Sequence, residues 1–208
     1  MYMSIENTLN KRKQIKLFDT ENVPDKKLII SLIDKTFELV PSKQSLMPYK
    51  VHVLGPEFKD LKERFFNISK TKTGGVYNNN ILAPYVLIFT RRLVKNPNID
   101  VQRKITFGHN YGVCDPKRYK NFDKDAAIEI GMFSKILTTL CLENNIDVSY
   151  LLCFPTKEQD KRWYEFDFLD DEILFSMQLG YKSNKFTRNK NKEETKPKKN
   201  EIINWLKG

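Results

Sequence analysis

The chain has 208 residues, 40% of them hydrophobic and 12% aromatic, which predicts a folded globule and excludes a disordered chain. No apolar run is typical of a signal peptide or reaches the roughly 18 residues of a membrane span, so we expect a soluble, cytoplasmic protein. The net charge of +10 raises nucleic acid as a partner, but eight basic and two acidic residues lie between 182 and 199. Because the rest of the chain is close to balanced, the charge argues against a nucleic-acid surface.

Cysteine and histidine are too few and too scattered for a metal site built by the protein. Cys114, Cys141 and Cys153 lack metal-ligand spacing, and His52 and His109 stand alone. No catalytic triad, P-loop or Gly-x-Gly-x-x-Gly turn is present. If the chain is an enzyme, we therefore expect a bound cofactor to carry the chemistry.

A basic segment, Lys11 to Asp19, lies near the amino terminus. Its polar and basic side chains precede an apolar pair and are Arg12, Lys13, Gln14 and Lys16. Charge-assisted donors of this kind suit a phosphate, and arginine can present two at once. A solvated basic lead-in to the fold is the alternative.

The next element is an amphipathic helix that runs from Pro24 to Val40, with proline as its first residue. A polar loop follows from Pro41 to Pro48, and a strand follows from Tyr49 to Leu54. The loop could offer donors to an anion or a ring edge from three residues after Pro41, which are Ser42, Lys43 and Ser45. An ordinary helix-to-strand connection is the alternative.

Apolar spacing predicts a second helix from Phe58 to Phe65, and then a polar stretch from 67 to 80. The continuous apolar run from Ala83 to Thr90 predicts a strand buried on both faces.

Residues 93–124 form the least regular region, which we interpret as a lid-like insert that sets substrate choice or as an insert with no role beyond packing. The wide apolar face of 123–142 predicts a long helix, and its Gly131 suggests a close packing contact. Strands are predicted for 148–154 and 173–179, with a polar helical segment from 157 to 172 between them. Residues 182–208 form a basic C-terminal extension that ends in an apolar cluster with a tryptophan.

Several of these segments together resemble the nitroreductase family of flavin mononucleotide (FMN) enzymes. That family begins with a basic segment ending in an aromatic and an acid, here Phe18 and Asp19. A Pro-Ser loop follows with a second proline and an aromatic, here Pro48 and Tyr49. Late in the chain come a Leu-Gly-Tyr strand end, at 179–181, and a basic pair, Lys196 and Lys198. The order matches over most of the chain.

The resemblance implies a single nitroreductase-like α+β domain over 1–208, with a central, mostly antiparallel sheet flanked by helices. It also implies a homodimer in which the C-terminal extension wraps the partner. FMN would be the cofactor, and the resemblance implies that it is held by Arg12, Lys13, Gln14, Lys16, Pro41, Ser42, Lys43, Ser45, Asn78, Lys196 and Lys198. Asn78 is among them because the family places a polar contact to the flavin ring just upstream of the Ala-Pro strand, and its side-chain amide would reach the ring. The sequence departs from the family at Tyr150 to Pro155, where many members carry a Pro-x-Glu-Gly-like turn. The backbone amides of Leu152 and Cys153 could still face the flavin there.

In the activity that the resemblance implies, NADH or NADPH reduces the flavin, and a flat acceptor such as a nitroaromatic or quinone is then reduced. No protein side chain is assigned a catalytic role. A non-enzymatic, basic nucleic-acid-binding module is the competing function, and a flavin protein of the same fold with other chemistry is the third.

Overall fold

The computed structural model describes residues 4–42, 45, 47–69, 78–92, 122–152, 154, 166, 173–185 and 197–203, apart from the side chains at 122, 123 and 200. Ten helices and strands lie in this part of the chain. They are α1 (Ile5–Asn10), α2 (Lys26–Leu39), β1 (Tyr49–Leu54), α3 (Lys59–Ser69), the 3-10 helix η2 (Asn79–Leu82), β2 (Tyr85–Arg91), α5 (Phe122–Glu143), β3 (Asp147–Leu151), β4 (Ile173–Gly180) and α6 (Lys199–Ile202).

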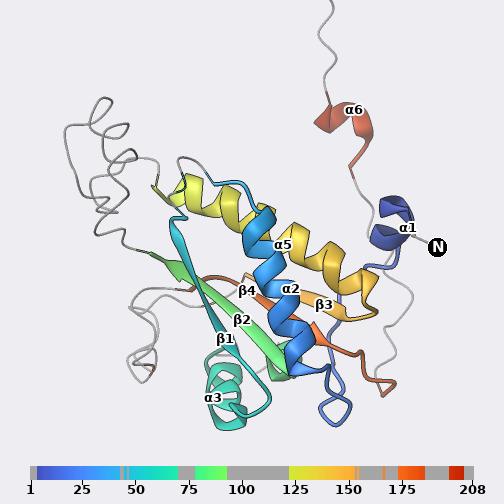
Figure 1. Ribbon diagram of the computed structural model, residues 1–208, viewed down its shortest axis with the longest axis vertical. Helices are drawn as coiled ribbons and strands as arrows, with labels where there is room; N and C mark the ends of the chain where they lie inside the picture. Colours follow the sequence, from blue (N-terminus) through green and yellow to red (C-terminus); the bar gives the residue numbers. More distant parts are fainter. Residues whose placement is uncertain are drawn as a thin grey trace, which may run out of the picture.

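The four strands form one antiparallel sheet in the order β1-β2-β4-β3. Helices α2 and α5 cover one face, and α3 lies on the other (Figure 1). The predicted α+β fold with an antiparallel sheet is therefore confirmed. The predicted lid-like insert lies almost wholly outside the described residues, as does the polar segment 157–172, of which only Phe166 is described.

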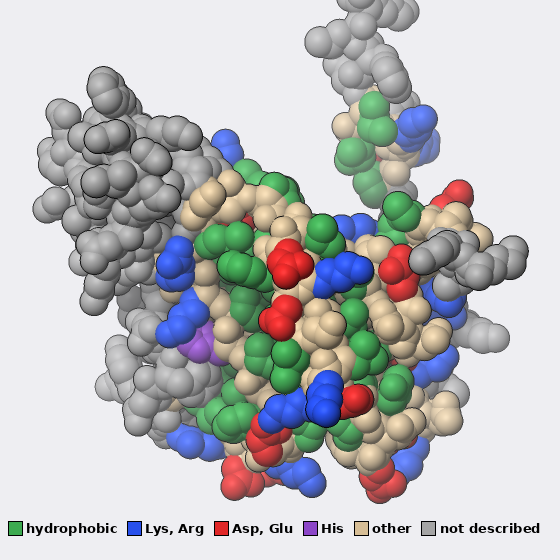
Figure 2. Space-filling view, viewed as in Figure 1, with side chains coloured by type: hydrophobic (Ala, Val, Ile, Leu, Met, Phe, Trp, Pro, Cys, Tyr) green, Lys and Arg blue, Asp and Glu red, His purple; other side chains and the backbone are tan. Residues whose placement is uncertain are grey.

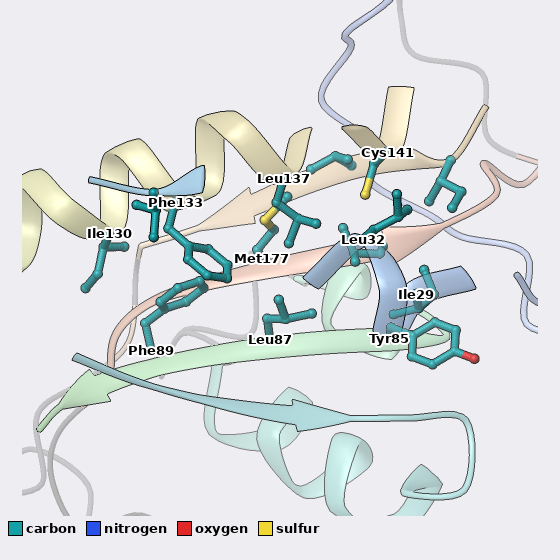
Figure 3. Close-up of a cluster of buried hydrophobic side chains, with 14 of the residues drawn as sticks. Ile29, Leu32, Tyr85, Leu87, Phe89, Ile130, Phe133, Leu137, Cys141 and Met177 are labelled. Atoms are coloured by element: carbon teal, nitrogen blue, oxygen red, sulfur yellow. The ribbon is translucent and has the colours of Figure 1, made fainter. Parts of the chain in front are cut away.

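Strand β2 is buried on both faces, as its continuous apolar run predicted. Its alternating side chains divide between the two sides of the sheet. Leu87 and Phe89 pack against α2 and α5, whereas Val86 and Ile88 pack against α3. Figure 3 shows the first of these two cores, where the rings of Phe89 and Phe133 meet edge to face between β2 and α5.

A row of aromatic rings crosses the first core from one edge strand to the other. The ring centroid of Tyr49 on β1 lies 6.1 Å from that of Phe89 on β2. The Phe89 centroid lies 5.5 Å from that of Phe175 on β4. The Phe175 ring centroid in turn lies 5.6 Å from that of Tyr150 on β3. Cross-strand aromatic pairs at such distances stabilise a sheet beyond the area that they bury.

Local sequence sets the ends of two helices. Asp25 caps α2 by accepting a hydrogen bond from the backbone N–H of Lys27 at 3.0 Å, so Pro24 lies just before the helix rather than at its first residue. Asn145, after α5, takes φ 57°, a left-handed conformation that asparagine tolerates and that turns the chain into β3. Gly131 does not mark a close contact within the described part of the chain, because an added Cβ would meet nothing within 4 Å.

Gly180, at the end of β4, is different. A Cβ added there would lie 2.7 Å from Cδ of Pro84 and 3.0 Å from Cδ1 of Phe18. Phe18 also forms a bridge with Lys182, and the N–H of Asp19 donates to the carbonyl of Tyr181 at 2.8 Å. The absence of a side chain at Gly180 thus lets the N-terminal segment lie against the sheet.

Candidate functional site

The basic N-terminal segment wraps around the edge strand β3. The Gln14 amide donates to Oγ of Ser149 at 2.9 Å and to the carbonyl of Tyr150 at 2.9 Å. The Arg12 guanidinium lies over the Tyr150 ring, with Cζ 5.8 Å from the ring centroid. Because Ser149 and Tyr150 point to opposite faces of the strand, Gln14 and Arg12 hold the segment on both sides of the sheet edge.

The positive charges of this segment form no salt bridge with the part of the chain that the structure describes. Lys11, Lys13 and Lys16 are exposed and Arg12 is half-buried. Within the described residues, none of the four forms an ion pair. The arrangement can therefore accept an anion without first breaking a salt bridge of the described chain.

Gln14 itself is anchored rather than free. Both hydrogens of its amide are donated inside the chain, to Ser149 and Tyr150. Its predicted contact with a cofactor phosphate stays a prediction, and it would require those bonds to open.

Behind Gln14 lies a buried polar network that sequence reasoning missed. Asn80 donates to Oγ of Ser149 at 3.0 Å and to Oε1 of Gln178 at 3.1 Å, and Gln178 donates to Oγ of Ser176 at 2.7 Å. The Oδ1 atom of Asn80 has no hydrogen-bond partner in the described part of the chain. Alternating polar residues on β4, at 176 and 178, were the only sequence signal for this network.

The Pro41 loop lies at the other edge of the sheet, at the start of β1. Ser42 is half-buried and accepts a hydrogen bond from the N–H of Met47 at 2.9 Å, while Pro41 and Ser45 are exposed. Ser45 has φ 57°, and Lys43 lies outside the described residues. Arg92, after β2, closes the loop by donating from Nε to the carbonyl of Met47 at 2.8 Å.

The remaining candidates are scattered. Asn78 donates to the carbonyl of Ser69 at 3.1 Å, at the end of α3. Leu152 follows β3 and is 71% exposed, and Cys153 lies outside the described residues. Lys198 is the exposed N-cap of α6, which lies beyond α1 and away from the sheet (Figure 1), whereas Lys196 is not described.

The structure thus brings Arg12, Gln14 and Leu152 to the β3 edge and leaves the Pro41 loop at the β1 edge. Three strand spacings, roughly 14 Å in total, separate the two edges. No described contact joins the two groups within one chain, so a single nucleotide that touches both would have to span the sheet or lie between two chains.

Lys62 is a buried cation that sequence reasoning treated only as part of an amphipathic helix. It is 4% exposed, and its Nζ donates to the carbonyls of Ala83 and Pro84, each at 2.9 Å. Burial lowers the pKa of this ammonium to about 8, although the nearby Glu57 opposes the shift. The side chain ties α3 to the start of β2.

Two cavities lie away from the predicted cofactor residues, and Lys62 lines one of them. One of about 220 Å³ is lined by Thr20, Val23, Pro56, Lys59, Lys62, Glu63, Leu82 and Pro84. The other, of about 390 Å³, is lined by Leu17, Phe18, Asp19, Thr20, Glu21, Asn79, Leu82, Ser183, Asn184 and Lys185. Neither contains a residue predicted to hold the flavin.

Three further features of the described chain bear on function: its buried cysteine, its possible metal ligands and the hydropathy of its helices. Cys141 is fully buried, and burial raises the pKa of its thiol to about 12, so it acts as a small hydrophobic side chain. Among the described residues, no cluster of His, Cys, Asp or Glu is placed to hold a metal ion. In the same part of the chain, no helix is both apolar enough and long enough to cross a bilayer.

Comparison of sequences identifies no relative. No protein-family model matches the chain. The curated proteins likewise contain no match.

Comparison of structures gives a clear result. A nitroreductase with bound FMN from Bacteroides fragilis superimposes with a TM-score of 0.62 at 14% identity, over 99% of this chain and 100% of the other. A candidate NAD(P)H:FMN oxidoreductase from Staphylococcus epidermidis gives a TM-score of 0.67 at 14% identity, over 99% and 97% of the two chains. A nitroreductase family protein from Streptococcus pneumoniae gives 0.62 at 16% identity, over 98% and 100%. The resemblance read from the sequence is confirmed at the level of architecture: the chain has the nitroreductase fold.

Proposed function

We propose that this chain is an FMN-dependent oxidoreductase that transfers a hydride from NADH or NADPH to a flat acceptor such as a nitroaromatic or a quinone. In this proposal residues 1–208 form one nitroreductase-like domain, which acts as a homodimer in the cytoplasm. The lid-like insert at 93–124 would shape the acceptor side of the site.

The observation that carries the proposal is the unpaired basic segment in this particular fold. Four cations, Lys11, Arg12, Lys13 and Lys16, lie within six residues of a segment that is fixed against β3. Anions such as phosphate are bound by donors of this kind. Solved proteins of the same fold include nitroreductases with bound FMN, which makes the phosphate of that nucleotide the ligand we favour.

The residues present suit FMN in their chemistry. Arg12, Lys13 and Lys16, with Lys196 and Lys198 of the tail, would hold the phosphate as cations. The Pro41 loop, through Ser42, Lys43 and Ser45, and the amide of Asn78 would meet the ring edge. Backbone N–H groups at Leu152 and Cys153 would face the electron-rich end of the ring. When bound, FMN supplies the hydride chemistry, so these residues act as binders.

Two features support a site shared between two chains. The β3 edge and the Pro41 loop, which would both contact the nucleotide, lie at opposite edges of the sheet in one chain. The outer face of α2 also exposes large apolar side chains, with Ile30, Phe37 and Leu39 each about half exposed or more. Figure 2 looks onto the face carried by α2 and α5, where hydrophobic side chains are interspersed with acidic and basic ones. An apolar helix face of this kind suits a partner subunit.

The decisive experiment is an absorption spectrum of the purified protein, before and after incubation with FMN and desalting. We expect flavin bands that persist after desalting and a flavin-dependent oxidation of NADH or NADPH when a nitroaromatic or quinone is added. Protein that retains no flavin under either condition would contradict the proposal.

The same cations would also suit nucleic acid, so the competing function is tested in parallel. Binding of a mixed-sequence oligonucleotide that weakens steeply with salt, by protein without flavin, would favour the nucleic-acid module. Binding of FMN without measurable oligonucleotide binding would exclude it.

A further inference from the structure

Tyr150 stands where the sequence departs from the nitroreductase pattern, and its ring is held from several directions. Its hydroxyl forms a short hydrogen bond with Oγ1 of Thr138 on α5. Its ring packs on Phe175, at the end of the row of rings that crosses the sheet. Burial raises the pKa of this phenol, so the hydroxyl stays protonated at neutral pH.

The guanidinium of Arg12 lies over this fixed ring, with its Cζ 5.8 Å from the ring centroid. A guanidinium over an aromatic face is attracted by the ring quadrupole, and a guanidinium presents several N–H donors that suit a phosphate. The Tyr150 carbonyl meanwhile accepts from Gln14, two residues further along the same segment. One residue of β3 therefore fixes both the backbone course of the basic segment and the direction of its arginine.

We propose that Tyr150 is a positioning residue for the phosphate site: its ring holds the Arg12 guanidinium in the orientation that receives the phosphate of the nucleotide. This role rests on the proposed flavin function and deepens it. It would also explain the aromatic residue at 150 in the altered turn. The ring gives the Arg12 side chain, which lies on an exposed segment, a rigid surface to pack on.

The test uses riboflavin as a probe that lacks the phosphate. The ratio of the Kd for riboflavin to the Kd for FMN measures the phosphate contribution alone, whereas general loosening of the fold weakens both ligands. Tyr150→Leu is expected to lower this ratio by about fivefold. Tyr150→Phe keeps the ring and should keep the ratio, although it loses the bond to Thr138.

A double-mutant cycle assigns the effect to the arginine. In an Arg12→Ala background, Tyr150→Leu should cause no further loss of FMN preference. An equal loss with and without Arg12 would overturn the proposal, because the ring would then act by another route.

A measurement without ligand guards against a variant that merely folds poorly. In protein labelled with ¹⁵N-arginine, the Arg12 Nε–H resonance should carry a ring-current shift that Tyr150→Leu removes and Tyr150→Phe preserves. If the chemical shift of the Arg12 Nε–H resonance is the same in Tyr150→Leu as in the wild type, the proposal is overturned.

The outcomes distinguish a failure of the proposed flavin function from a failure of the proposed role of Tyr150. Wild-type protein that binds neither FMN nor riboflavin overturns the proposed function and this role with it. Wild-type protein that prefers FMN, together with a Tyr150→Leu variant that prefers it equally, overturns the role of Tyr150 alone.

Discussion

Positive charge is used in two different ways in this molecule. Lys62 is buried, and its ammonium is satisfied by two carbonyl oxygens at the entrance to β2. The cations around Arg12 lie on the surface of an edge strand, and the described chain offers them no counter-charge. The first arrangement costs desolvation and stabilises one connection, whereas the second keeps charge available for a ligand. Burial and satisfied hydrogen bonds, rather than the residue type, separate a structural lysine from one that is available to a ligand.

The largest expected effect comes from removing the buried cation. Lys62→Ala leaves the carbonyls of Ala83 and Pro84 unpaired and opens a cavity beside α3, so the free energy of unfolding should fall by about 3 kcal/mol. Urea denaturation measures the change. Lys59→Ala is the matched control and should change stability little. Lys59 is an exposed residue of the same helix and lines the same existing cavity of about 220 Å³ as Lys62. Equal effects of the two substitutions would contradict the distinction.

A second effect follows from the pKa of Lys62, which is about 8 in the folded chain against an ordinary 10.5. Between these pH values the unfolded chain holds a proton that the folded chain has lost, so the free energy of unfolding gains from this group as pH rises. The gain is up to about 3 kcal/mol and is absent below pH 8, where both states are protonated.

Comparison with Lys62→Met isolates this gain, because that variant keeps the shape of the stem but cannot titrate. The stability of the wild type relative to Lys62→Met should rise from pH 8 to pH 10.5. The Cys141 thiol, whose raised pKa acts in the opposite direction above pH 9, is common to both proteins and cancels. A constant difference between the two curves would show that Lys62 does not titrate in this window.

The surface cations should behave in the opposite way. Arg12→Ala should weaken FMN binding by about tenfold or more, since a charge-assisted bond to phosphate is lost, and should leave the midpoint of thermal unfolding almost unchanged. Flavin retained after desalting measures the first quantity and circular dichroism the second. Lys35→Ala, an exposed lysine of α2, is the control. Full flavin occupancy in the Arg12 variant would refute the phosphate assignment.

The smallest effect is expected for the tail. Lys198→Ala removes one exposed charge at the start of α6, so flavin retention should fall by about two- to fivefold without unfolding. Lys199→Ala, the next residue, is the comparison. If Lys198→Ala and Lys199→Ala retain flavin as well as the wild type, the tail does not reach the phosphate.

Much of the fold could be predicted because its longer elements carry a clear hydrophobic period. Helices α2, α3 and α5 and strands β1, β2 and β4 lie within a few residues of the predicted ranges, and β3 ends three residues early. The short helices α1 and α6 and the 3-10 helix η2 were missed, because four to six residues are too few to show a period. The order of strands depends on pairings between distant segments, which local patterns do not encode.

The site was harder to predict for the same reason. The sequence pointed to Arg12 and Gln14 by their charge and polarity, but their partners at 149 and 150 are more than 130 residues away. Lys62 looked like an ordinary polar position on an amphipathic helix, because its two acceptors are backbone carbonyls that carry no side-chain signature. The roles of Lys43, Cys153 and Lys196 stay predictions outside the described residues.

The Leu-Gly-Tyr sequence at the end of β4, residues 179–181, is one of the points of resemblance to the nitroreductase family. With Pro84 on one side and Phe18 on the other, the middle position has no room for even a methyl group. Any larger residue would force Pro84 or Phe18 to shift, and Phe18 belongs to the basic segment that carries Arg12. A pattern that sequence comparison treats as a point of likeness is, in this molecule, a steric condition for packing the N-terminal segment against the sheet.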